Sequence, residues 1–247
     1  MIMKGLWTFF AFPLNLLLAS LGVVGLVILW RNHRESAVTK FLLSPAATIS
    51  SISLFLASCL WMGLSGDNDF QVSIIFVLVL LYMLSVVLMV ILRGWRRPDG
   101  KIRWRFLFIH AGLLIAVGSA FWGSPDSSEL RVRLSKGQVA QTAYELDGSI
   151  TGLRHTLELI DYSTEYSSDG KPVHYEARVS VDGQVPATIT VNNPLSVDIG
   201  RDIYLASISD DGCVLQIVIE PWRYLALAGI IMLLAGAFML FIKGPVR

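Results

Sequence analysis

The chain has 247 residues, of which 54% are hydrophobic and 16% are charged, and its formal net charge is +1. Soluble globular domains carry about 25% charged residues, and disordered chains combine low hydrophobicity with high net charge, so the composition excludes both classes. The small net charge hides two opposite parts. Residues 124–221 hold seven basic and fifteen acidic side chains, a net −8, and the remaining residues carry +9. Such asymmetry indicates association with a membrane.

Five apolar segments are long enough to cross a bilayer, which takes about 20 predominantly apolar residues. They contain no Asp, Glu, Lys or Arg apart from Arg223 at the edge of the last one, and all seven tryptophans lie at or near their ends. Tryptophan is typical of the membrane–water interface. We therefore predict a bundle of five transmembrane helices, with Pro13 inside the first. The predicted helices cover residues 6–30, 41–63, 71–92, 106–123 and 222–242.

The short loops predict the orientation of this bundle. Three basic residues separate the first two spans and six separate the third and fourth, whereas the loop at 64–70 has none. Basic loops stay in the cytoplasm, so we expect the N-terminus and residues 124–221 outside and the C-terminal tail inside. A cleaved signal peptide is disfavoured for residues 6–30, because the apolar run exceeds a signal h-region and lacks a small-residue cleavage site.

The acidic part changes from long apolar runs to alternation of apolar and polar residues, which is typical of half-buried strands. Asp-Gly and Asn-Pro turn signals separate about seven strands, and we expect one small antiparallel all-β barrel or sandwich. The expected architecture is an integral membrane protein with four helices in 1–123, an inserted extracytoplasmic β domain in 124–221, and a fifth helix with a cytoplasmic tail in 222–247. The clearest strands are expected at 130–134, 156–160, 175–181, 188–191, 203–207 and 214–219.

Most familiar catalytic motifs are missing. The chain has no phosphate-binding loop, HExxH, CxxC or GxSxG motif, and the spans hold no paired carboxylates of the kind that proton-coupled transporters use. Cys59 and Cys213 are interpreted as small hydrophobic side chains, because a redox pair would need Cα atoms within about 7 Å. His33, His155 and His174 are interpreted as exposed or structural histidines.

His110 is different because it lies inside a predicted span, about 7 Å from the cytoplasmic end. Two roles remain open, a neutral histidine that hydrogen-bonds across helices and a ligand. A neutral imidazole binds haem iron well, and haem is a large, flat, apolar cofactor that a helix interface can hold. Gly112 and Gly118 would allow a helix or a macrocycle to approach closely.

Short motifs follow one another in a fixed order over about residues 40–242. They are FLLSP at 41–45, GD at 66–67, RFLFIHAGLL at 105–114, HTLELIDY at 155–162, EY at 165–166, GKP at 170–172, VNNPL at 191–195, IY at 203–204 and EP at 220–221. Together these motifs resemble the ResB/CcsB family of system II cytochrome c biogenesis. Family members usually have four spans and a much longer outer domain, so the chain looks like a short form with an extra N-terminal span.

The resemblance implies a partner of the CcsA type, with which the chain moves haem to the outer face and presents it to an apocytochrome c. His110 matches the intramembrane histidine of the family, which implies an axial ligand to a transient haem b shared with CcsA. Arg103 and Arg105 are candidates to pair with haem propionates, although the positive-inside pattern explains them as well. The expected fold or docking determinants of the β domain are Asp161, Glu165, Tyr166, Asn192, Asn193 and Pro194.

The expected function is therefore a membrane subunit of the system II cytochrome c synthase in the bacterial inner membrane, non-catalytic or co-catalytic within a haem lyase complex. An alternative is a cofactor-free membrane scaffold whose β domain docks apocytochrome or stabilises a respiratory or biogenesis partner. A third is an unrelated membrane-anchored β domain. The lipid bilayer is an expected partner in every case, and nucleic acid in none. The acidic outer domain is expected to steer a basic apocytochrome.

Overall fold

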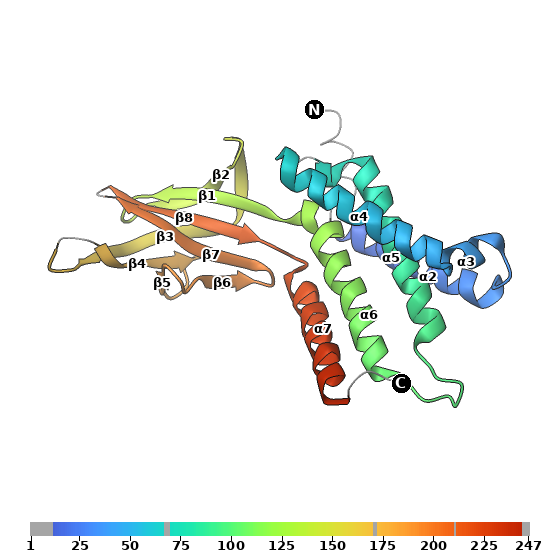
Figure 1. The fold of residues 1–247 in the computed structure, drawn as a ribbon. Helices are drawn as coiled ribbons and strands as arrows, with labels where there is room; N and C mark the ends of the chain where they lie inside the picture. Colours follow the sequence, from blue (N-terminus) through green and yellow to red (C-terminus); the bar gives the residue numbers. More distant parts are fainter. Residues whose placement is uncertain (1–11, 67–69, 170–171, 210, 244–247) are drawn as a thin grey trace. The chain divides into compact units, whose positions relative to one another are not determined.

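The computed structural model describes residues 12–66, 70–169, 172–209 and 211–243. The chain divides into two compact units, of which the first combines Met1–Pro125 with Trp222–Arg247 and the second is Asp126–Pro221. The first unit is helical and the second consists of strands (Figure 1). Each unit has hydrophobic clusters of its own.

Among the described residues, five helices are long and apolar enough to cross a membrane, as the sequence predicts. They are α2 (Leu14–Asn32), α4 (Pro45–Ser65), α5 (Ile74–Gly94), α6 (Trp104–Val117), which continues as the π-helical turn η2 (Gly118–Trp122), and α7 (Arg223–Lys243). The shorter elements are α3 (Ala37–Leu42) and two 3-10 turns, η1 (Phe70–Val72) and η3 (Ser124–Asp126).

Two helix boundaries differ from the prediction. Pro13 is the N-cap residue of α2 rather than an interior residue, and residues 6–11 of the predicted first span lie outside the described residues. The predicted second span is broken, because Ser44 caps α4 by accepting a hydrogen bond from the Ala47 N–H and Pro45 occupies the first turn. Proline suits that position, since its missing N–H would have no partner within the helix.

Helix α5 is the most buried span and contacts α2, α4 and α6. Side-chain hydrogen bonds join α5 to α4 and η2 to α2. The Tyr82 hydroxyl lies 2.9 Å from the Ser50 hydroxyl and donates to the Ala47 carbonyl, and the Trp122 indole donates to the Asn15 carbonyl at 3.0 Å. Bonds of this kind hold helices together where apolar surroundings supply no other polar partner.

Helices α6 and α7 pack with their backbones in contact. A Cβ atom at Gly112 would lie 2.8 Å from the Gly229 carbonyl oxygen, and one at Gly229 would lie 2.6 Å from the Ala116 nitrogen. A Cβ atom at Gly236 would lie 2.6 Å from Cγ1 of Ile109. Small residues permit this approach in membrane helices. The expectation that Gly112 admits a close helix is confirmed.

The second unit is one antiparallel sheet of eight strands in the order β5-β4-β3-β2-β1-β8-β7-β6 (Figure 1). The predicted antiparallel all-β fold is confirmed, with β2, β6 and the first half of β3 as strands that the sequence did not predict. The strands are β1 (Ser128–Leu134), β2 (Val139–Glu145), β3 (Ile150–Tyr166), β4 (Pro172–Val181), β5 (Ala187–Thr190), β6 (Leu195–Asp198), β7 (Arg201–Ser209) and β8 (Gly212–Ile219).

The sheet curls around its own core. Strand β5 approaches β6 and β7, although no backbone ladder joins β5 to either of them in the described part of the unit. The sheet is therefore a curled single layer with an open seam, rather than a sandwich of two sheets. The interior contains fully buried aliphatic side chains from both halves of the sheet, including Leu134, Leu157, Leu159, Val179, Ile189 and Leu215.

The first and last strands of this unit are neighbours. Strands β1 and β8 pair over seven residues, from Ser128 opposite Ile219 to Leu134 opposite Cys213. The two chain connections consequently leave from the same end of the sheet, which we call the connection end. The opposite end, which holds the turn after β1 and the long β3–β4 hairpin, is the far end.

The α6–α7 contact predicts different effects for two glycine substitutions. Gly112→Ala places a Cβ atom against the α7 backbone, and such overpacking costs about 1–3 kcal/mol. Gly63→Ala, in α4, meets nothing within 4 Å and should be neutral or stabilising by up to about 1 kcal/mol. Thermal unfolding of the detergent-solubilised chain measures both, and equal shifts would contradict the backbone contact.

Candidate functional site

His110 lies on α6 and its ring is half-buried. Its Nδ1 atom is 2.9 Å from the Phe106 carbonyl oxygen, one helical turn earlier. Because a carbonyl only accepts hydrogen bonds, Nδ1 carries the proton in this contact, and a neutral ring then has a free lone pair on Nε2. The same arrangement fixes the tautomer and ring orientation of metal-binding histidines.

The Nε2 atom of His110 is not completely enclosed by the described residues. Nε2 has no hydrogen-bond partner among the described residues. Every fully buried side-chain nitrogen or oxygen in those residues does have a partner. Nε2 therefore keeps some exposed surface.

One face of α6 carries three side chains in contact. The Phe106 ring stacks on the His110 ring with centroids 4.0 Å apart, and the Arg103 guanidinium lies 5.0 Å from the Phe106 centroid. Arg103 also donates to the Gly94 carbonyl, and the Phe106 ring packs directly on Gly94. The start of α6 is thus anchored to the end of α5, and this anchor positions His110.

The two glycines near His110 differ in the space that they leave beside the helix. Gly112 is occupied by the α7 backbone, so it serves helix packing and not a macrocycle. A Cβ atom at Gly118 would meet only Leu84, at 3.9 Å, so that side of α6 remains open. Arg105 is half-buried and engaged in an interaction of its own.

Three of the predicted docking residues, Asp161, Glu165 and Tyr166, lie toward the far end of the sheet. Asp161 forms an ion pair with Lys136 at 2.7 Å, and this contact holds the pKa of Asp161 below its ordinary value. Glu165 and Tyr166 are exposed at the end of β3. Asn193 exchanges backbone hydrogen bonds with Thr190, which confirms that Asn192, Asn193 and Pro194 belong to a turn.

An apolar hollow lies beside this turn, where β5 and β7 approach each other. Its volume is about 230 Å³. It opens along the seam that no backbone ladder closes. The lining residues are Tyr175, Val191, Leu205, Ala206, Ser207 and Ile208.

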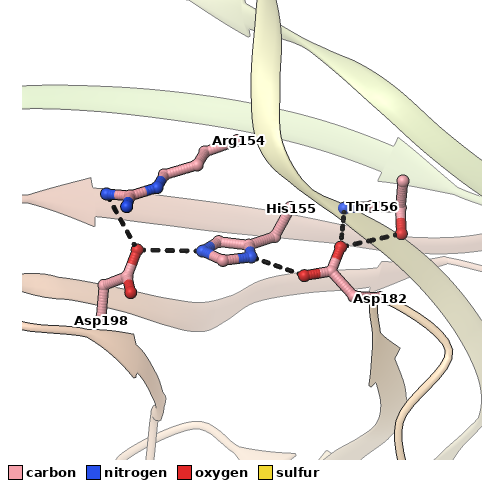
Figure 2. A network of polar contacts seen from close by, with 5 residues as sticks. All are labelled: Arg154, His155, Thr156, Asp182 and Asp198. Carbon is pink, nitrogen blue, oxygen red and sulfur yellow. Dashed lines mark hydrogen bonds and ion pairs between the residues drawn. The ribbon is translucent and has the colours of Figure 1, made fainter.

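His155 is the centre of a polar network that ties the seam together (Figure 2). Its Nδ1 lies 2.6 Å from Asp182 and its Nε2 lies 2.9 Å from Asp198. Arg154 pairs with Asp198 at 3.4 Å, and Asp182 also accepts from the N–H and hydroxyl of Thr156. Strand β3 is thereby joined to β6, which stands at the opposite edge of the sheet.

The network favours a protonated imidazole. Two carboxylates face one ring, and a neutral ring could donate to only one of them. The hydrogen bonds to Asp198 and Asp182 accordingly raise the pKa of His155 above its ordinary value, and His155 lowers the pKa of each carboxylate. The structural role expected for His155 is borne out by these contacts. Its partners, 27 and 43 residues away, were not predicted.

The remaining histidines and cysteines form no further site in the described residues. His33 and His174 are exposed, as expected. Cys59 and Cys213 are free thiols, and burial raises the pKa of Cys213 to about 11, which makes it unreactive. No group of three or more His, Cys, Asp or Glu side chains is arranged to hold a metal ion in the part of the chain that the structure describes.

The His155 network predicts a limited pH range of greatest stability. The stabilisation that protonated His155 contributes is complete below the ordinary histidine pKa of 6.5. It is lost as the pH rises through the raised pKa of His155. The stabilisation that ionised Asp182 and Asp198 contribute is complete above the ordinary aspartate pKa of 3.8. It is lost as the pH falls through the lowered pKa values of these two carboxylates. NMR titration of the His155 ring should give a midpoint above 6.5, and Asp198→Asn or Asp182→Asn should each lower it. Asp211→Asn, at an exposed acid in the β7–β8 turn, is the control, and an equal shift there would contradict the network.

Comparison with known proteins agrees with the sequence motifs. Residues 102–223 match the model of the ResB-like family, and a search of curated proteins finds no match. Among solved structures, a chain described as cytochrome c heme lyase CcmF is similar at 13% identity and a TM-score of 0.46, over 94% of this chain and 40% of that one. The chain thus spans less than half of that protein, and a likeness at this level bears on neither fold nor function. The residues that match the ResB-like family model include α6 and the whole β unit.

Proposed function

We propose that this chain is a membrane subunit of the system II cytochrome c synthase, which holds haem transiently through His110 and passes it toward apocytochrome c on the outer face. Its partner in this work is a CcsA-type protein. The match to the ResB-like family model supports a role in cytochrome c biogenesis. The observation that carries the haem role is the His110 ring, whose Nδ1 is bonded to the Phe106 carbonyl while Nε2 has no hydrogen-bond partner among the described residues.

Haem would be the cargo of this protein, and the residues present fit one half of its ligation. His110 supplies one imidazole nitrogen in apolar surroundings, which suits haem iron. In this proposal the second axial ligand comes from the CcsA-type partner. Arg103 and Arg105, at the start of α6, are placed one to two turns from His110 and are our candidates to pair with the propionates.

Two contacts with Phe106 would hold the His110 ring in a fixed orientation for binding haem iron. The bond to the Phe106 carbonyl fixes the tautomer of the ring and holds its plane. Stacking on the Phe106 ring limits its rotation further. An ordered ligand loses less conformational entropy when it binds, which favours binding without added contacts.

The proposed placement is the bacterial inner membrane, with five spans. Basic loops after α2 and α5 would lie in the cytoplasm, and the N-terminus and the β unit would lie outside. His110 would then be near the cytoplasmic side, where haem enters. The far end of the sheet would be available to an apocytochrome, with Tyr166 exposed and the apolar hollow beside the turn at Asn192 and Asn193.

His110→Ala removes the proposed ligand, and we expect haem bound to the chain co-purified with its CcsA-type partner to fall about tenfold or more. The cytochrome c yield should fall with it. The absorption spectrum of the purified complex measures the bound haem. His33→Ala, at an exposed histidine outside the spans, is the matched control and should leave the spectrum unchanged.

An unchanged spectrum in His110→Ala would remove His110 from the haem site. If the cytochrome yield were also unchanged while far-end substitutions lowered it, the cofactor-free scaffold would be the correct function. That alternative draws on the exposed far-end residues and the hollow, which can bind a protein without haem.

Tyr166→Ala tests the docking role of the far end. Exposed tyrosines often dominate binding energy, so we expect the affinity for an apocytochrome c to fall about five- to thirtyfold. Tyr144→Ala, at an exposed tyrosine near the connection end, is the control. Binding of labelled apocytochrome to the purified complex is the measurement, and equal losses in the two variants would count against a far-end site.

A further inference from the structure

We propose that two turns at the connection end insert Leu146 and Ile199 into the boundary between headgroups and acyl chains of the outer leaflet. These turns join β2 to β3 and β6 to β7. The inference rests on the membrane placement proposed above for α6 and α7. It adds a second attachment of the β unit to lipid, beside its two covalent connections.

Both turns carry aliphatic side chains where polar residues are usual. Leu146 is 69% exposed and Ile199 is 84% exposed. Tyr144 and Ile150, which pair across the β2–β3 hairpin, are 53% and 65% exposed beside Leu146. The far-end turn at 135–138 reads Ser-Lys-Gly-Gln and the one at 167–171 reads Ser-Ser-Asp-Gly-Lys, so neither contains a large apolar residue.

The strand register places both turns level with the chain connections. Leu146 follows Glu145, which pairs with Leu130 near the start of β1. Ile199 lies between β6 and Arg201, and Arg201 pairs with Ile219, the last residue of β8. Because β2 and β7 are the outer neighbours of the β1–β8 pair, the two turns flank the strands that lead into the spans.

The connections are short, which limits how far this end can stand from the membrane. Ile219 and Trp222 are three residues apart, so their Cα atoms are separated by at most about 11 Å. Tryptophan at the end of an apolar span is typical of the interface. Gly200 fixes the Ile199 turn to this connection, because it accepts a hydrogen bond from the Glu220 N–H at 2.6 Å and leaves no room for a Cβ atom.

The charges beside the tips indicate apolar insertion and not attraction to anionic lipid. Asp198, next to Ile199, is held by His155 and Arg154. Asp147, next to Leu146, accepts hydrogen bonds from Ser149. Neither tip has a lysine or arginine beside it in the sequence. Insertion should therefore occur in a neutral bilayer and should be independent of salt.

The test uses the full chain in nanodiscs of dioleoyl phosphatidylcholine. Leu146→Cys and Ile199→Cys are labelled with the polarity-sensitive dye NBD in a Cys59→Ser background, in which buried Cys213 does not react. Val173→Cys, at a 62% exposed aliphatic near the far end, is the matched control. We expect quenching by doxyl-labelled lipid only at the two tips. Quenching by aqueous iodide should be about threefold weaker there than at residue 173, since inserted groups lie 5–10 Å below the surface.

Equal iodide quenching at all three positions would overturn the proposal. Protection of the dyes at positions 146 and 199 from iodide that arises only when the CcsA-type partner is added would also overturn the proposal. That result would assign the two turns to a protein interface. Failure of the chain to enter nanodiscs would overturn the membrane placement itself, an outcome distinct from exposed tips on an incorporated chain.

Discussion

The pairing of β1 with β8 is the constraint on which the rest of this protein depends. Neighbouring strands lie about 4.8 Å apart, and closely packed helices have axes about 8–10 Å apart. A β unit whose first and last strands are neighbours can thus be inserted between two touching helices without separating them. The seven-residue ladder from Ser128 to Leu134 meets this condition, and Gly112 and Gly229 allow α6 and α7 to remain in contact.

The close contact between α6 and α7 at Gly112 and Gly229 also occupies one face of α6. Ile109, Gly112 and Ala116 recur at helical spacing and face α7. Phe106 and His110 lie one turn apart on another face, where their rings stack and Phe106 packs on Gly94 at the end of α5. The helix-packing contacts and the proposed haem ligand therefore lie on separate stripes of a single helix. A substitution on the glycine stripe would displace His110 only by shifting the whole helix.

Sequence patterns predicted those features that depend on local physics. Apolar length located the five helices, and alternation located strands such as Leu130–Leu134. Strand β2 was missed because its Val-Ala-Gln-Thr-Ala-Tyr-Glu segment buries only Ala143 completely and shows no regular apolar face. The partners of His155 were beyond prediction, since β3 meets β6 only because the sheet curls. The lone histidine in an apolar run was visible from the sequence, whereas its bond to the Phe106 carbonyl required coordinates.

Curling of the sheet also brings acidic and basic side chains together at the seam. Asp182 and Asp198 bring two negative charges to the seam, and Arg154 with a protonated His155 brings two positive charges. The raised pKa of His155 therefore makes the network electrically neutral at mildly acidic pH. A paired carboxylate is less costly beside apolar groups than an isolated one. Ile199 follows Asp198 directly, so the exposed aliphatic side chain of this turn lies beside an acid that is paired across the seam.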